Sequence, residues 1–140
     1  MSLRFTVFGP PAAQGSKTAV KNRHGTIVGS RESSNRVMPF RQACASAAVA
    51  AGARIIEGPV RMDIVVHAVR PASHFRKDGT LVLGAPMKPG GHDASKVCRA
   101  VEDALARICY ANDRAVRTLS IDFRYGDGPE RVEVEIGPCA

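Results

Sequence analysis

Hydrophobic residues recur at three- and four-residue intervals in the C-terminal half of the chain, a pattern that predicts a helix with one buried side. The helix is expected to begin at Ala94, because Pro89-Gly90-Gly91 prevents an earlier start and Asp93 stands where an N-cap residue is typical. Its free backbone N–H groups and dipole favour an anion at that end. The apolar positions are Val97, Ala100, Val101, Ala104, Leu105 and Ile108, and at 100° per residue the opposite side carries Ser95, Arg99, Glu102 and Asp103.

Four other stretches alternate between apolar and polar residues, as strands with one buried face do. They cover residues 3–8, 60–69, 118–125 and 131–136. The last two are separated by Gly126-Asp127-Gly128-Pro129, so we predict that they pair as a hairpin. A second helix is expected over about residues 39–51, because Pro39 suits a helix start and Gly52 a helix end.

The predicted order is therefore strand, helix, strand, helix, strand, strand, with long connections after the first and third elements. This order predicts an α+β fold in which two helices pack on one face of a mixed β-sheet. With 140 residues the chain is expected to form a single domain over residues 1–140. No apolar run is long enough for a membrane span, and residues 1–6 alternate like a strand and lack a signal peptide, so we expect a cytoplasmic protein without a membrane partner.

The first long connection, residues 12–36, is predicted to be an exposed basic loop with at most a weak hairpin at Thr26-Ile27-Val28. The chain carries a net charge of +7, and its first 41 residues hold seven basic residues against one acidic residue, Glu32. Such a concentration of charge suits a polyanionic partner. One reading is an arm that contacts phosphates, and the other is a solvated flexible loop; the candidate contacts are Lys17, Lys21, Arg23, Arg31 and Arg36.

The second long connection, residues 71–91, places an aromatic residue, Phe75, beside the basic Arg76 and Lys77. An exposed aromatic ring can stack on a base or enter a junction as a wedge. The more ordinary alternative is that Phe75 anchors its own loop. His67, inside the strand over residues 60–69, is interpreted as a sheet residue, and a zinc site at His92, Cys98 and Cys109 is a minor alternative.

Asp113 follows the central helix in a short polar turn and is expected at a helix-to-strand junction. Hydrolysis of a phosphodiester needs an activated water and neutralisation of charge on the phosphoryl oxygens, which Mg²⁺ supplies when carboxylates hold it. Asp93 and Asp113 can converge only if the following strand runs back alongside Asp93. Otherwise Asp93 is an ordinary N-cap and Asp113 a turn residue.

The stretch D93-A-S-K-V-C-R-A-V-E-D-A-L105, followed by N112-D-R-A-V116, resembles the core of RusA-type Holliday junction resolvases. The resemblance is specific over roughly 25 residues. It implies the same α+β architecture, a homodimer with two sites across a basic face, and three aspartates that hold Mg²⁺ beside a basic side chain. The function that it implies is the paired nicking of four-way DNA junctions in recombination and repair.

Position by position, the resemblance assigns metal binding to Asp93 and Asp113, and makes Arg99 the basic residue at the phosphate. Asp103 matches the aspartate of the family's Asp-Ala-Leu, and it also suits an i,i+4 ion pair with Arg99. Ser95 stands where the family has its second metal aspartate. The predicted catalytic residues are Asp93, Asp113, Arg99, Ser95 and Asp103, and the predicted DNA contacts are Lys17, Lys21, Arg23, Arg31, Arg36, Arg76, Lys77, Lys88 and Lys96.

Ser95 offers a neutral oxygen and no charge, which leaves three outcomes open: a weaker nuclease, recruitment of another carboxylate such as Asp103 or Asp63, or a binding protein without cleavage. Glu102 is expected to point elsewhere. The favoured hypothesis is a dimeric, Mg²⁺-dependent endonuclease for Holliday junctions, with Mn²⁺ as an alternative cation. The rival is a branched-DNA-binding module of the same fold, and an RNA-binding protein lacks support because only 5% of the residues are aromatic.

Overall fold

The body of the molecule is a four-stranded mixed β-sheet, seen in the computed structural model, which describes residues 2–14, 17–32 and 36–140. The order across the sheet is β1 (Leu3–Phe8), β6 (Arg131–Pro138), β4 (Val60–Ala68) and β5 (Val116–Tyr125). Two strand pairs are antiparallel, β1 with β6 and β6 with β4, whereas β4 and β5 are parallel. All four strands fall where the alternating pattern predicted them.

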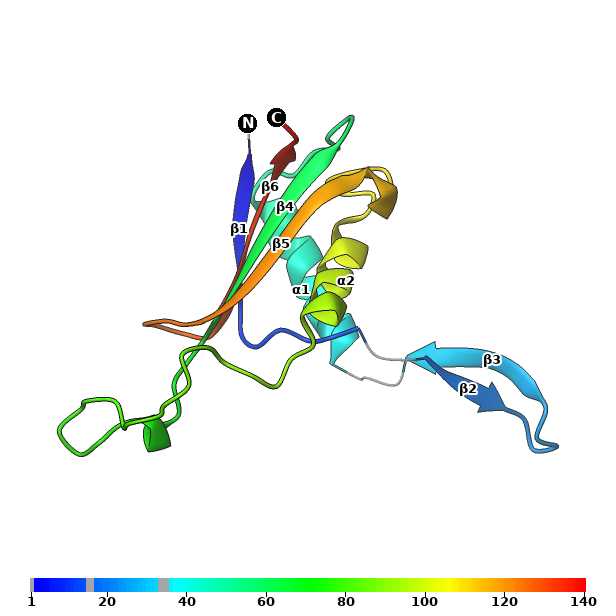
Figure 1. The fold of residues 1–140 in the computed structure, drawn as a ribbon. Coiled ribbons are helices and arrows are strands. Elements are labelled where there is room, and N and C mark those ends of the chain that lie inside the picture. Colours follow the sequence, from blue (N-terminus) through cyan, green and yellow to red (C-terminus); the bar gives the residue numbers. More distant parts are fainter. Residues whose placement is uncertain (1, 15–16, 33–35) are drawn as a thin grey trace.

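Both helices of the body, α1 (Val37–Ala50) and α2 (Ala94–Leu105), lie on the same face of the sheet (Figure 1). The predicted α+β architecture is therefore confirmed. The start of α2 at Ala94 is also confirmed, and α1 begins two residues before Pro39. Among the described residues, no helix has the length and apolar character needed to cross a membrane.

The core lies between this face and the two helices. Along β4 and β6 every second side chain is buried, as the pleat of a half-covered sheet requires. The intervening side chains point to the uncovered face and pair with one another there, for example Arg4 with Glu135 at 3.1 Å and His67 with Glu133 at 3.2 Å. The buried residues of the two strands include Met62, Ile64, Val66, Val132, Val134 and Ile136.

The predicted hairpin between the last two strands is wrong, because β4 lies between β5 and β6 and pairs with both. The connection over residues 126–130 is long enough to cross the end of β4, since next-but-one strands are only about 10 Å apart. Gly126 begins this crossing and lies close to β4. Its N–H donates to the Ala68 carbonyl at 3.1 Å, and a Cβ at Gly126 would lie 2.9 Å from His67 Nδ1.

The loop predicted over residues 12–36 is only partly correct. Its middle forms an antiparallel hairpin of β2 (Lys17–Lys21) and β3 (Ile27–Glu32), separate from the main sheet, which extends the weak hairpin expected at residues 26–28. The Asn22 side chain organises the turn by accepting from the N–H groups of His24 and Thr26 at 2.9 and 3.0 Å, the local bonding that favours Asn in turns. Residues 15–16 and 33–35 of the predicted loop lie outside the described residues.

The second long connection is a loop, as predicted, and it projects from the body on the side opposite the β2–β3 hairpin (Figure 1). Near its base, Arg70 lies over the Tyr125 ring at 4.2 Å and donates to the Pro86 carbonyl at 2.8 Å. Phe75 forms an isolated β-bridge with Leu81 across the loop. The bridge joins backbones and the Phe75 side chain is 42% exposed, so both roles considered for its ring stay predictions.

Candidate active site

Asp93 caps the N-terminus of α2, as its sequence position predicted. Its carboxylate accepts a hydrogen bond from the backbone N–H of Lys96 at 3.3 Å. Such a cap occupies one of the free donors at the start of the helix. The side chains of Asp93, Ser95 and Lys96 are all exposed, so this first turn is open to solvent on the side away from the core.

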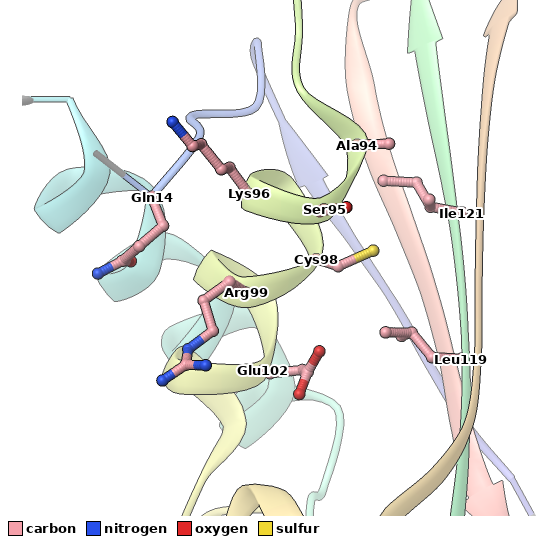
Figure 2. Close-up of a pocket in the computed structure, with 9 residues that line it drawn as sticks. All are labelled: Gln14, Ala94, Ser95, Lys96, Cys98, Arg99, Glu102, Leu119 and Ile121. Carbon is pink, nitrogen blue, oxygen red and sulfur yellow. The ribbon is translucent and has the colours of Figure 1, made fainter. Parts of the chain in front are cut away.

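A cleft of about 610 Å³ separates the exposed side of α2 from β5, and it contains two of the predicted catalytic residues, Ser95 and Arg99. Figure 2 shows that α2 forms one wall, while Leu119 and Ile121 of β5 form the other. The strand after the central helix thus runs back alongside it. The lining residues are Gln14, Ala94, Ser95, Lys96, Cys98, Arg99, Glu102, Leu119 and Ile121.

The carboxylate that lines this cleft belongs to Glu102, which we expected to point elsewhere. Figure 2 shows Ser95, Cys98 and Glu102 extending from the same side of α2 toward β5. The spacing of these residues, i, i+3 and i+7, places them on one side of a helix, so the signal was already present in the sequence. The sequence does not show which of the serine, arginine and acidic residues on this side of the helix face the cleft. That depends on where the sheet lies relative to the helix.

The environment of Glu102 shifts the pKa of its carboxyl upward. Partial burial raises the pKa of its carboxyl, the nearby Arg99 guanidinium opposes that shift, and the negative charges of Asp113 and Asp103 add to it. Within the described part of the chain, the Glu102 carboxylate forms no hydrogen bond and no ion pair; only the Glu102 backbone carbonyl is bonded, accepting from the Tyr110 hydroxyl at 2.6 Å. A half-buried carboxylate without a cationic contact is thus exposed to the cleft.

Arg99 forms the ion pair with Asp103 that its i,i+4 spacing suggested, with Arg99 Nε 3.4 Å from Asp103 Oδ1. The Arg99 side chain is 61% exposed and Asp103 22% exposed. In Figure 2 the guanidinium of Arg99 extends away from the row formed by Ser95, Cys98 and Glu102. The Arg99 guanidinium therefore lies at the rim of the cleft, where it is paired with the Asp103 carboxylate.

Asp113 opens a 3₁₀ turn, η2 (Asp113–Ala115), directly before β5, so its predicted place at a helix-to-strand junction is confirmed. Tyr110, three residues before Asp113, donates from its hydroxyl to the Glu102 backbone carbonyl at 2.6 Å, so the turn begins close to the C-terminal half of α2. Asp93 lies nine residues before Glu102, about 13 Å along the helix axis. The structure thus brings Asp113 toward Glu102, and a cation shared by Asp93 and Asp113 stays a prediction.

The residues around the cleft suit a hard cation held by few protein ligands. No group of three or more His, Cys, Asp or Glu side chains in the described ranges is placed to hold a metal ion, so the alternative zinc site at His92, Cys98 and Cys109 finds no support. Mg²⁺ commonly takes only one or two carboxylates and completes its shell with water and substrate phosphates. Of the candidate oxygen donors, Ser95 and Glu102 line the cleft.

The predicted DNA contacts described in this paragraph belong to four parts of the chain. Lys17 and Arg31 belong to β2 and β3, Lys21 and Arg23 have exposed side chains at the end of that hairpin, and Arg36 is exposed at the start of α1. Arg76 and Lys77 are exposed in the loop over residues 71–91. In Figure 1 the hairpin and the loop both leave the body at the end where α2 begins. Lys96 lies at that end as well.

Lys88 differs from the other predicted contacts because it forms an ion pair with Asp122 of β5. Asp122 also pairs with Arg124 at 2.6 Å, and the hydrogen bonds from Lys88 and Arg124 lower the pKa of this carboxyl to about 2. Part of the positive charge at Lys88 is therefore neutralised within the protein. Next to this group, His92 stacks on Phe123 of β5 with ring centroids 6.1 Å apart, so the residue just before Asp93 contacts the sheet.

Comparison with known proteins gives two matches. The family model described as endodeoxyribonuclease RusA matches residues 9–137, nearly the whole chain. An uncharacterized protein, YqaN, of Bacillus subtilis (strain 168) is 31% identical over 140 residues, a match that covers 96% of this chain and 94% of that protein. The family match includes α2, the cleft and the turn at Asp113.

Proposed function

Because the chain belongs to the RusA endodeoxyribonuclease family, we propose that it is a Mg²⁺-dependent endonuclease that resolves Holliday junctions and related branched DNA by paired nicks. Its place would be in DNA recombination and repair, with Mn²⁺ as an alternative cation. One observation carries the proposal within this chain: the cleft between α2 and β5 combines a carboxylate, a hydroxyl and a guanidinium at the position of the family resemblance.

We assign the cation to Asp93 and Asp113, with the Ser95 hydroxyl or a water molecule completing its shell. When bound, Mg²⁺ would lower the pKa of a water nucleophile and neutralise charge on the phosphoryl oxygens. The protein's own task is then to place the phosphate. Arg99, at the rim of the cleft, is suited to donate to a phosphoryl oxygen, and a charge-assisted bond of this kind gains strength as negative charge develops.

Asp103 is proposed as a positioning residue. Its carboxylate holds the Arg99 guanidinium at 3.4 Å from the side away from the DNA, which limits the directions that Arg99 can take. Because Asp103 is itself more buried than Arg99, the pair is anchored at the protein end. Without Asp103, the guanidinium would spend more of its time away from the phosphate.

The basic residues of the β2–β3 hairpin and of the loop over residues 71–91 are proposed to follow the DNA backbone on two sides of the cleft. Contacts of this kind are independent of sequence and weaken with salt because bound counterions are released. A homodimer is part of the proposal, since two copies of the cleft related by a two-fold axis would meet equivalent strands of a junction.

The test is nicking of a synthetic four-way junction in Mg²⁺, with linear duplex of the same sequence as the substrate control. Asp93→Asn and Asp113→Asn should each lower the nicking rate by about 100-fold or more, the scale of losing one centre of transition-state stabilisation. Asp127→Asn is the matched control, because Asp127 is exposed in the β5–β6 connection. Equal activity of all three variants, or equal cleavage of linear duplex, would contradict the proposal.

A second function, binding to branched DNA without cleavage, is favoured by two observations. Ser95 gives the cleft no negative charge, and the described residues contain no group of three metal-binding side chains. This alternative predicts salt-sensitive binding to the junction and no nicks in either Mg²⁺ or Mn²⁺. The same assay, run with both cations, separates the two functions.

A further inference from the structure

Glu102 is the carboxylate that α2 presents to the cleft. In the described part of the protein it forms no side-chain hydrogen bond or ion pair, and the positive charge of Arg99 offsets its negative charge only in part. It lines the cleft together with Ser95 and Arg99, and Figure 2 shows its carboxylate directed toward Leu119 on the opposite wall. The nearby cation, Arg99, forms its ion pair with Asp103 and not with Glu102. Glu102 therefore keeps its acceptor oxygens available to a ligand in the cleft.

The direction of the side chain brings this charge toward Ser95. Side chains on an α-helix lean toward its N-terminus, so the carboxylate of Glu102 covers the turn that precedes it, the turn between Ser95 and Glu102. Cys98 lies in that interval on the same side of the helix. A ligand between α2 and β5 would thus meet the Glu102 carboxylate from one end and the Ser95 hydroxyl from the other.

A second carboxylate lies nearby. The charge of Asp113 acts on Glu102, and Asp113 is likewise without a side-chain hydrogen bond or ion pair to the residues that the structure describes. Two neighbouring carboxylates repel each other unless a cation lies between them or one is protonated. Packing does not require this arrangement, because Glu102 is only half-buried and a glutamine would fill the same space.

We propose that Glu102 is a ligand of the divalent cation, and that it supplies from α2 the negative charge that Ser95 does not provide. The inference rests on the proposed function and deepens it by adding a residue to the cation site. The cation would then lie in the cleft over the turn between Ser95 and Glu102, where water and the substrate phosphate would complete its shell. Ser95 then contributes at most a neutral oxygen or a hydrogen bond to a bound water.

The test measures binding of Mn²⁺ to the DNA-free protein at pH 8 by electron paramagnetic resonance, with Mg²⁺ binding followed by calorimetry. Glu102→Gln should weaken Mn²⁺ binding by about tenfold or more, since even outer-shell changes at metal sites cost that much. Glu57→Gln, an exposed glutamate in the segment before β4, is the matched control and should bind Mn²⁺ as the wild type does. Thermal unfolding of each variant verifies that it is folded.

A double variant tests whether the lost Mn²⁺ affinity can be rescued. Adding Ser95→Asp to Glu102→Gln returns a carboxylate to the same wall of the cleft and should recover at least part of the lost Mn²⁺ affinity. Wild-type affinity in Glu102→Gln, or an equal loss in Glu57→Gln, would overturn the inference. Junction nicking is measured separately. If Glu102→Gln weakens Mn²⁺ binding but the wild type makes no nicks, the nuclease function is rejected. If Glu102→Gln changes neither nicking nor Mn²⁺ binding, only the role of Glu102 as a ligand is rejected.

Discussion

The two sides of α2 differ in what they contribute to the protein. On the side toward the core, Val97, Val101 and Leu105 have no exposed surface. On the side toward the cleft, Ser95 and Arg99 are exposed and Glu102 is half-buried. Because an α-helix has 3.6 residues per turn, the twelve residues of α2 place core residues on one side and cleft residues on the other.

The difference teaches where stability and reactivity are located. Apart from the hydroxyl of Tyr110, the buried side chains of the described residues are apolar groups and thiols, so the core side of α2 packs mainly against apolar groups. The cleft side instead holds a carboxylate without a partner, beside the charge of Asp113. Such a group lowers stability, as functional sites often do, and its presence is explained if it binds a ligand.

The largest expected effect comes from the core side. Leu105→Ala should lower the free energy of unfolding by about 2–5 kcal/mol, because it removes a fully buried side chain and leaves a cavity. Urea denaturation measures this change. Leu83→Ala is the control, since Leu83 is 94% exposed and its loss should cost less than about 0.5 kcal/mol. Similar values for the two variants would break the comparison.

Asp93 belongs to both sides of the comparison, because it caps the helix and is a proposed cation ligand. Asp93→Ala should lower the free energy of unfolding by about 1 kcal/mol, whereas Asp93→Asn should leave it nearly unchanged, since Asn caps as well as Asp. Both variants should lose junction nicking. If Asp93→Asn retained full activity while Asp93→Ala lost stability alone, Asp93 would be a structural cap only.

The smallest effect is expected at Glu102. Its pKa is raised above the ordinary value of 4.5, so the folded protein binds this proton more tightly than the unfolded chain. The resulting stability is complete below the unfolded pKa and is lost as pH rises through the folded pKa. Glu102→Gln lacks that loss, so it should be more stable than the wild type at neutral pH, by less than about 1 kcal/mol because the half-exposed group is screened.

Urea denaturation at about pH 4 and about pH 8 tests this sign. The difference in unfolding free energy between Glu102→Gln and the wild type should grow from the lower to the higher pH. Glu57→Gln should show no such growth, because Glu57 is exposed. A variant that is less stable than the wild type at the higher pH would show that Glu102 has a stabilising partner.

Several features of the fold could be predicted because neighbouring residues determine them. The alternation of Leu3, Phe5 and Val7 identified β1, and the Pro-Gly-Gly sequence before Asp93 identified the start of α2. The pairing of the last two strands could not be predicted in this way. The turn at residues 126–129 suits a hairpin equally well as a crossing over β4, and only the packing of β4 between β5 and β6 decides.

The sequence by itself determined the strand and helix positions, the cap at Asp93 and the family resemblance, since each depends on periodicity or on residues close together in the chain. The tertiary structure alone decided that β5 faces the exposed side of α2, that Glu102 enters the cleft between them, and that Asp113 approaches Glu102. The physical reason is that burial and charge proximity arise from contacts between distant segments. Whether a polar side chain on a helix faces solvent or a cleft is determined only by the position of the opposing strand.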